Sequence, residues 1–389
     1  MNYFEESLKL HEKYMGKISI KSKVKINSRE DLSLAYSPGV AKPCLKIKEN
    51  KDNVFKYTSK GNLVAVITDG SAVLGLGNIG VEASLPVMEG KAILFKEFGG
   101  VDAIPITVDS NDVDEFVNTV KLISKTFGGI NLEDISAPRC FEIEERLKKE
   151  IDIPVFHDDQ HGTAIVVLAA LINSLKIVKK KIEEVKIVVN GMGAAGTAIA
   201  KLLKSAGAKH IVPCDKVGIL NNNQNLVGHY KELAELFNKE SLCGNLSDAL
   251  VDADVFIGVS ASNILKAEHI RKMKNDSIIF AMANPNPEIM PEEAKKGGAR
   301  IIGTGRSDYP NQINNVSIFP GLFRGALDVK AKIINEEMKI AAAKALAEYI
   351  DEKELNENYI IPSPLDKNIA KKIAEAVKRA AIETKVSRI

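Results

Sequence analysis

The chain has 389 residues, of which 45% are hydrophobic, so it can bury a large core. Single cores seldom grow beyond about 250–300 residues, and the length therefore favours two domains. The 53 basic and 51 acidic residues leave a formal net charge of +2. This balance argues against a strongly basic nucleic-acid-binding protein and gives no reason to expect a membrane surface as a partner.

Cysteine usage and the first residues indicate where the protein acts. The four cysteines are scattered without a C-x-x-C pair, at Cys44, Cys140, Cys214 and Cys243. Scattered thiols are typical of a reduced cytosolic enzyme rather than of a disulfide framework. Residues 1–16 are polar and charged, unlike a signal peptide, and no uninterrupted apolar run reaches about 18 residues. We therefore expect a cytoplasmic protein with no membrane-spanning helix.

The first part of the chain mixes helices with short strands. An apolar run at residues 63–68 predicts a fully buried strand. Residues 103–108 predict another strand, although Pro105 is unfavourable inside a sheet. Residues 153–156 predict a short strand that leads into a long apolar helix from about Thr163.

The second part is a regular alternation of strands and helices. Strands are expected at residues 185–190, 211–215, 254–259, 277–282 and 300–303, and helices at residues 194–206, 334–350 and 367–382. This alternation implies a parallel sheet with helices on both faces. We predict an α/β protein with an N-terminal α/β substrate domain, residues 1–160, and a Rossmann-like, doubly wound domain with C-terminal helices, residues 161–389.

A glycine-rich segment with G-x-G-x-x-G spacing predicts a dinucleotide site, because it directly follows a strand and opens a helix. Its first glycine permits a tight turn, the second lets the backbone approach a pyrophosphate, and the third packs the helix against the strand. The acid that ends the next strand would bind the adenosine ribose and favours NAD, but Lys216 beside it leaves NADP possible. The predicted contacts are Gly191, Gly193, Ala194, Ala195, Gly196 and Asp215.

A second match to the same spacing occurs at residues 75–80. It does not directly follow its strand, and no acid ends a following strand at the expected distance. We therefore interpret it as a glycine-rich loop near a ligand rather than as a second nucleotide site. Contact with the cofactor from the opposite side is left open.

Two short segments rich in carboxylates suggest a metal site. Residues 156–163 contain two aspartates and two histidines, and Glu133 and Asp134 follow a glycine turn. Clustered carboxylates are hard oxygen ligands that suit Mg²⁺ or Mn²⁺, and Asp159 is the strongest single candidate. Glu133 and Asp134 can share one ion only if their segment is bent. The alternatives are a zinc site at the histidines, a solvated acidic loop or a helix cap.

Single residues elsewhere could take part in proton transfer or in binding. Lys91 interrupts an apolar helix face, and burial would lower its pKa as a general base requires, unless the side chain reaches solvent. Tyr36 lies in a turn and could donate a proton or simply pack. Asn284 ends a buried strand, where ligands bind in doubly wound sheets. Asn284, Asn314 and Asn315 could bind a ligand or form turns.

Taken together, these segments resemble the malic enzymes, over roughly residues 10–330. The matching segments are 36–41, 68–70 with 74–77, 90–91, 133–134, 156–163, 191–196, 284–285 and 314–321. The chain is similar to the short bacterial and archaeal type, which lacks the extra acyltransferase-like domain of longer relatives. The resemblance implies NAD(P)-dependent oxidative decarboxylation of (S)-malate to pyruvate with Mg²⁺ or Mn²⁺, with oxaloacetate decarboxylation a possible side activity.

The resemblance also implies roles for individual residues. Lys91 would be the general base, Tyr36 the general acid, and Asp158 the residue that tunes Lys91. The implied metal ligands are Glu133, Asp134 and Asp159. The implied substrate contacts are Lys91, Asn284 and Asn315, and the implied cofactor contacts include Asn284 and Asn314. A homodimer is implied, with active-site residues shared across its interface.

One departure from the family pattern concerns substrate recognition. Animal and plant members carry an arginine shortly after Thr-Asp-Gly that binds the substrate carboxylate, whereas this chain has Ser71-Ala72-Val73 there. The carboxylate must therefore be bound from elsewhere. The alternative function is a malolactic reaction, malate to lactate with bound NAD, which would use the same residues.

Overall fold

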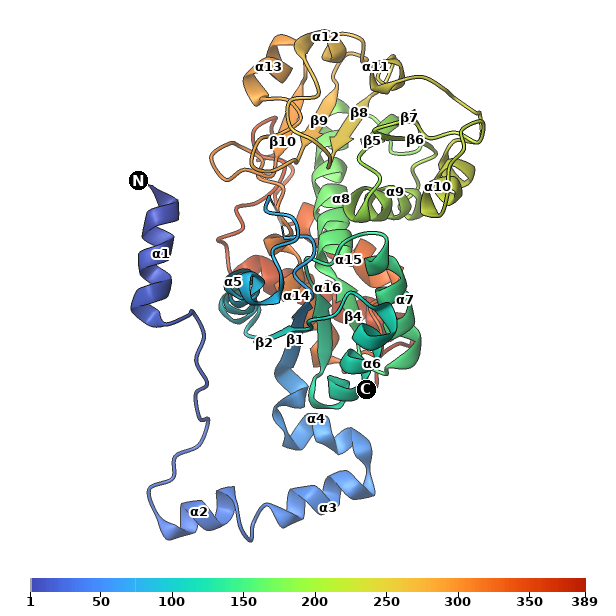
Figure 1. Ribbon diagram of the computed structural model, residues 1–389. Helices are drawn as coiled ribbons and strands as arrows, with labels where there is room; N and C mark the ends of the chain where they lie inside the picture. The colour runs from blue at the N-terminus through green and yellow to red at the C-terminus, as the bar shows by residue number, and fades with distance from the viewer. Residues whose placement is uncertain (1, 74) are drawn as a thin grey trace.

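The computed structural model describes residues 2–73 and 75–389. These residues form an N-terminal arm and two β-sheets that stand one above the other (Figure 1). Helices cover both faces of each sheet, and a long helix, α8, runs from the lower sheet past the upper one.

The arm consists of α1 (Tyr3–Tyr14), α2 (Arg29–Ala35) and α3 (Ala41–Glu49), and none of these helices contains a buried residue. It extends away from the sheets at the left and bottom of Figure 1. The short helices α4 (Val54–Tyr57) and η2 (Ser59–Asn62) lead from the arm into the first strand. The arm touches the body at Lys17, whose Nζ donates to the carbonyl of Pro86 at 2.6 Å.

The first sheet has four parallel strands in the order β2-β1-β3-β4. They are β1 (Leu63–Thr68), β2 (Asp102–Thr107), β3 (Gly129–Leu132) and β4 (Val155–His157). Every residue of β1 is buried, as the apolar run predicted. Pro105 lies in β2, an edge strand, where a missing N–H is tolerated. Strand β3 was not predicted from the sequence.

Two pairs of helices cover this sheet. On one face α6 (Val113–Ile123) and α7 (Arg139–Glu150) pack against the apolar residues that include Ala65 and Ile67. On the other face α5 (Val81–Gly99) and α14 (Phe319–Asp328) pack against Val64 and Val66. Helix α14 in turn packs against α16 (Asn368–Glu383), so C-terminal helices help to cover the first sheet. The boundary between residues 160 and 161 stays a prediction.

The second sheet has the order β10-β9-β8-β5-β6-β7, and all pairs are parallel except β6–β7. Its strands are β5 (Lys186–Asn190), β6 (His210–Asp215), β7 (Gly218–Ile219), β8 (Val255–Gly258), β9 (Ile278–Ala281) and β10 (Ile301–Thr304). The strand order reverses between β5 and β8, which makes this the switch point of a doubly wound, Rossmann-like sheet. The predicted α/β fold class is confirmed.

Helices lie on both faces of the second sheet. Ile187 and Val189 face the core shared with α8 (Asp158–Val178), α9 (Ala194–Ser205), α10 (His229–Phe237) and α15 (Glu336–Ala347). Val188 faces the opposite core with α11 (Leu246–Ala249), α12 (Ala267–Ile270) and α13 (Pro291–Lys296). Alternate side chains of β5 thus pack into two different cores on opposite faces of the sheet, as expected for a central strand.

Helix α8 begins at Asp158, five residues earlier than the predicted start near Thr163. Asp158 and Asp159 therefore occupy its first turn, where the helix dipole favours negative charge. By length and composition alone this helix could also cross a membrane. It was not predicted as such from the sequence, because no uninterrupted apolar run reaches about 18 residues. However, 67% of its most apolar window is buried inside the protein, as is typical of a core helix.

Candidate active site

Lys91 lies on α5 and reaches the point where the first sheet meets α8. Its Nζ is 2.6 Å from Oδ2 of Asp158 and 2.8 Å from Oε1 of Glu133. The ring of Phe319, on α14, lies against the ammonium group, with its centroid 4.4 Å from Nζ. Because Lys91 is only 8% exposed, the alternative that its side chain reaches solvent is wrong.

The pKa of Lys91 departs from the expectation based on sequence. Burial lowers the pKa of this amine, but the ion pairs with Asp158 and Glu133 outweigh burial and raise the pKa above its ordinary value. The prediction of a lowered pKa is therefore wrong, because the pattern along one helix does not reveal acids on other elements. A divalent cation among these carboxylates would neutralise part of their charge and so lower the pKa of Lys91.

Three carboxylates converge beside Lys91. One oxygen from each of Glu133, Asp134 and Asp159 can be chosen so that all three lie within 4.8 Å of one another. The φ angle of Asp134 is +54°, so the backbone bends just after β3 and turns two sequence neighbours toward one point. Oδ2 of Asp159 also accepts a hydrogen bond from the backbone N–H of Asp134 at 2.8 Å. The bent segment that a shared ion requires is therefore present.

The charges of this group fit a divalent cation. Burial raises the pKa of Glu133 and that of Asp159, and neighbouring carboxylates raise both further. Carboxylate oxygens are the ligands that Mg²⁺ and Mn²⁺ prefer. Within residues 2–73 and 75–389, no other three His, Cys, Asp or Glu side chains converge in this way.

Asp158 stands apart from the three converging carboxylates. It is fully buried, and its Oδ2 accepts a hydrogen bond from Nζ of Lys91. Burial raises the pKa of Asp158 to about 7, although the charge of Lys91 opposes the rise. Its contact with Lys91 is the geometry expected of a residue that tunes the lysine.

The two histidines of the acidic run do not belong to the converging carboxylate group. Nε2 of His161 lies 2.9 Å from the Glu144 carboxylate, and its Nδ1 lies 3.1 Å from Nζ of Lys339. His157 is fully buried, with Nε2 3.6 Å from Oδ2 of Asp159. Burial lowers the pKa of His161 to about 4 and also lowers that of His157. Neither histidine belongs to the converging group, so the zinc alternative has no structural support.

The glycine-rich loop joins β5 to α9, as predicted. A Cβ at Gly196 would overlap the carbonyl oxygen of Gly191, so this glycine lets the helix approach the strand. A Cβ at Gly193 would meet nothing within 4 Å, so the backbone there faces open space. Ala194 and Ala195 begin α9, and no side chain caps their helix. The N–H groups of this first turn are therefore available to an anion such as a pyrophosphate.

Asp215 ends β6 beside this loop. Its Oδ2 accepts a hydrogen bond from the backbone N–H of Met192 at 2.7 Å and one from the hydroxyl of Tyr230 at 3.4 Å. A cavity of about 1200 Å³ opens next to Gly193, between α7 below and α9 and α10 above. The acid thus lies at the loop and near a crevice between the two sheets.

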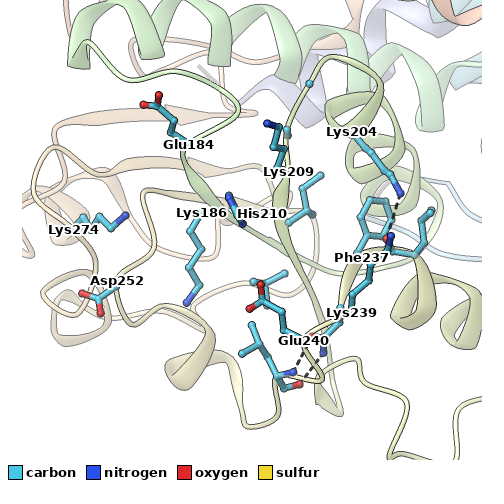
Figure 2. A pocket seen from close by; sticks show the side chains of 17 residues that line it. Glu184, Lys186, Lys204, Lys209, His210, Phe237, Lys239, Glu240, Asp252 and Lys274 are labelled. Atoms are coloured by element: carbon cyan, nitrogen blue, oxygen red, sulfur yellow. Dashed lines mark hydrogen bonds between the residues drawn. The ribbon is translucent and has the colours of Figure 1, made fainter.

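A second pocket lies at the other end of the same sheet (Figure 2). It has a volume of about 820 Å³ and is surrounded by charged side chains that include Lys186, Lys209 and Glu240. Lys186 and His210 are the first residues of β5 and β6, whereas the glycine loop and Asp215 lie at the carboxyl ends of these strands. This pocket is therefore separate from the nucleotide loop.

The three predicted asparagines differ in position. Asn315 lies against the first turns of α8, since a Cβ at Gly162 would lie 3.1 Å from Cβ of Asn315. Oδ1 of Asn314 accepts a hydrogen bond from the N–H of Val316 at 3.0 Å, so it also shapes its own turn. Asn284 follows β9 and is exposed, and a Cβ at Gly305, just after β10, would lie 3.2 Å from its Nδ2. Asn315 thus lies close to Asp158, because the Cβ at Gly162 would also overlap Oδ1 of Asp158.

Tyr36 is not brought to the site of its own chain. It ends α2 in the N-terminal arm, and 70% of its surface is exposed. No side chain of α1, α2 or α3 is buried, so the arm does not pack into the body of the chain. One chain alone therefore assembles Lys91, Asp158 and the three carboxylates, but not the predicted acid.

Two residues that hold the site in place, Asn131 and Arg139, were not predicted. Asn131, fully buried in β3, donates from Nδ2 to Oε2 of Glu133 at 2.8 Å. Arg139, on α7, pairs with Asp69 at 2.7 Å and so stabilises the loop after β1. This is the loop in which the substrate-binding arginine of animal and plant members is absent. A polar residue inside an apolar strand is a signal that could have revealed Asn131. No local pattern distinguishes Arg139 from other helix residues.

Comparisons with known proteins agree with this arrangement. Residues 15–148 match the model of the malic enzyme N-terminal domain, and residues 160–382 match that of the malic enzyme NAD-binding domain. The chain belongs to the malic enzyme family. It is therefore an oxidoreductase of a family with NAD- and NADP-dependent members.

Relatives and solved structures of this family match the chain over nearly its whole length. A bifunctional malic/malolactic enzyme from Bacillus subtilis (strain 168) is 59% identical over 100% of this chain and 95% of the relative. An NAD-dependent malic enzyme from Geobacillus stearothermophilus is 57% identical over 96% of this chain and 78% of the relative. The crystal structure of a malic enzyme from Pyrococcus horikoshii is 51% identical, with a TM-score of 0.96 over 99% of this chain and 92% of that one.

Proposed function

We propose that this malic enzyme family member converts (S)-malate to pyruvate and CO₂ while reducing NAD(P)⁺, with a divalent cation bound to Glu133, Asp134 and Asp159. The observation that carries the proposal is the position of the Lys91 ammonium group, held between Asp158 and Glu133 beside the converging carboxylates. The names of the relatives support the same reaction.

The residues around Lys91 suit proton transfer from the malate hydroxyl. A bound Mg²⁺ or Mn²⁺ would polarise the hydroxyl and later the keto oxygen, and a bound nicotinamide would take up the hydride. With the cation bound, the pKa of Lys91 would fall, and the neutral amine would accept the hydroxyl proton as hydride leaves C2, while Asp158 holds the amine in place. Phe319 excludes water from one side of the amine. These steps convert malate to oxaloacetate.

Oxaloacetate is a β-keto acid and loses CO₂ to leave the enol of pyruvate. This enol needs a proton on C3, and Tyr36 is the proposed donor. Asn284 and Asn315 are proposed to bind the substrate, and Asn284 and Asn314 the nicotinamide. The same site could also decarboxylate added oxaloacetate.

The protein is proposed to act as a homodimer in which Tyr36 enters the active site of the partner subunit. The arm exposes many large apolar side chains, among them Tyr3, Phe4, Ile20 and Leu34. Exposed apolar surface on this scale is typical of an interface. A second copy of the chain would cover the arm and would also supply the acid that each site lacks.

A complementation experiment tests the shared site. Tyr36→Phe and Lys91→Ala should each be nearly inactive, because each lacks one member of the acid–base pair. In a mixed dimer, one of the two sites would receive both intact residues. Co-refolding equal amounts should therefore restore about a quarter of the wild-type kcat, since about half of the dimers are mixed and one site in each works. No recovery, despite mixed dimers seen by native mass spectrometry, would contradict the shared site.

NAD is the proposed cofactor, with NADP possible, because Asp215 would repel a 2′-phosphate. Asp215→Asn should raise the KM for NAD and lower the ratio of kcat/KM for NAD to that for NADP by about tenfold, the usual scale for losing a hydrogen bond to a charged group. Asp254→Asn is the matched control, because Asp254 is a buried aspartate at the opposite end of the sheet, paired with Lys180. An unchanged ratio would rule out Asp215 as the ribose contact.

The malolactic reaction is the second candidate, because a relative of high identity carries both activities in its name. It would yield lactate and keep the reduced nicotinamide bound. Measuring free NADH, pyruvate and lactate after many turnovers distinguishes the two reactions. Free NADH in step with pyruvate supports the malic reaction, and lactate without free NADH supports the malolactic one.

We also propose a cytoplasmic location and small-molecule substrates rather than nucleic acid or membrane partners. All four cysteines are free thiols in the structure, and Cys140 and Cys214 are buried. Free thiols are typical of a reducing compartment.

A further inference from the structure

Glu288 is a buried carboxylate that none of the steps above uses. It follows β9 and is fully buried. Its Oε1 accepts a hydrogen bond from the backbone N–H of Ser260 at 2.8 Å, and its Oε2 accepts one from the backbone N–H of Ala283 at 3.0 Å. Ser260 lies just after β8 and Ala283 just after β9. One carboxylate therefore bridges the carboxyl ends of two neighbouring strands.

The same bridge extends to β5. Asn190, the last residue of β5, donates from Nδ2 to the hydroxyl of Ser260 at 2.7 Å, and this hydroxyl lies 3.4 Å from Oε1 of Glu288. A Cβ at Gly191 would lie 2.9 Å from Cβ of Ser260, so the first glycine of the dinucleotide loop packs against this serine. The strands β5, β8 and β9 are neighbours at the switch point, where dinucleotides bind in doubly wound sheets.

The buried Glu288 carboxylate requires a glycine at position 258 and the desolvation of a charge. A Cβ at Gly258, the last residue of β8, would clash with the Glu288 side chain. Burial raises the pKa of Glu288, and the hydrogen bonds from Ala283 and Ser260 oppose that rise. An apolar side chain of similar size would fill the space without desolvating a charge. Packing alone therefore does not explain a glutamate at this position. The three groups that donate hydrogen bonds to it, the N–H groups of Ser260 and Ala283 and the hydroxyl of Ser260, all lie at strand ends and do explain it.

We propose that Glu288 is a positioning residue that fixes the ends of β5, β8 and β9 around the nicotinamide half of the cofactor. Asn284, a proposed contact of nicotinamide and substrate, directly follows Ala283 and so takes its position from this bridge. Asp215, at the adenosine end, is held instead by hydrogen bonds from Met192 and Tyr230. Loss of the carboxylate therefore loosens the nicotinamide half of the site more than the adenosine half. This inference rests on the proposed nicotinamide-dependent function.

The test compares two ligands that differ in the nicotinamide alone. Isothermal titration calorimetry, without malate or metal, gives the Kd of NAD and of ADP-ribose for the wild type and for Glu288→Gln. The glutamine amide turns an N–H group toward one of the two backbone donors. NAD binding should weaken about tenfold, on the scale of a hydrogen bond to a charged group, while ADP-ribose binding stays within about twofold. If NADP binds better, NADP and 2′-phospho-ADP-ribose are used instead.

Glu293→Gln is the matched control, because Glu293 also accepts a backbone hydrogen bond, from Ala267 at 3.1 Å, but away from the strand ends. Unchanged NAD binding by Glu288→Gln, or equal weakening of both ligands, would overturn the proposal. If this variant does not fold, Ser260→Ala is measured in the same way, and only a selective loss of NAD affinity supports the bridge. Wild-type protein that binds neither dinucleotide would contradict the proposed function itself, and the role of Glu288 with it.

Discussion

Replacing Lys91 with alanine is expected to lower kcat for malate oxidation by about 10² or more, the usual scale for a positioned general base. The amine is buried, held by Asp158 and Glu133, and lies beside the proposed metal ligands. Alanine leaves no group that can take the hydroxyl proton. The measurement is steady-state reduction of the nicotinamide with saturating malate and Mn²⁺.

Lys60→Ala provides the control for this substitution. Lys60 is also a buried lysine, but its Nζ donates to the carbonyl of Lys125, in the short helix Ser124–Thr126 outside the site. Its loss should lower Tm while kcat stays within about twofold, because surface and core changes away from a site act mainly on stability. If Lys91→Ala instead keeps kcat within tenfold of wild type, Lys91 is not the base.

Asp159→Ala is expected to abolish metal-dependent activity. Asp159 is the one member of the carboxylate group that comes from α8, so its loss leaves only the two ligands that follow β3. Two carboxylates hold Mg²⁺ or Mn²⁺ far more weakly than three. Activity measured as a function of Mn²⁺ concentration should show no saturation in the variant at concentrations that saturate the wild type.

Asp112→Ala is the control for the metal prediction. Asp112 also accepts a backbone hydrogen bond with its carboxylate, from Glu115 at 2.9 Å, but it caps α6 away from the site. Its removal should cost about 1 kcal/mol of stability, as for other helix caps, without changing the dependence on Mn²⁺. An unchanged Mn²⁺ dependence in Asp159→Ala would remove Asp159 from the ligand set.

Much of the fold follows from local patterns in the sequence. The apolar run of β1 and the strand–helix alternation after residue 180 predicted strands that the structure contains. The dinucleotide loop was predictable because its glycines and the following acid have fixed spacing. The packing of α14 against α5 could not be predicted, because contacts between elements more than 200 residues apart leave no local signal in the sequence.

The site was predictable in its residue types but not in its electrostatics. The two carboxylate-rich segments indicated a metal site with Asp159 as the strongest candidate, and the family resemblance selected Glu133, Asp134 and Asp159 as the ligand set. The sign of the Lys91 pKa shift depends on acids from β3 and α8, which the α5 sequence does not contain. Likewise, the family motif marks Tyr36, but only the extended arm reveals that it lies outside the site of its own chain.

The proposed metal-dependent decarboxylation can be tested with a spectrophotometric assay of the purified protein with malate and Mn²⁺, run with NAD and with NADP, and repeated with EDTA. We expect that one of the dinucleotides is reduced, that pyruvate forms in equal amount, and that EDTA abolishes both. Absence of reduction with either dinucleotide, or a rate that EDTA does not change, would contradict the proposed reaction.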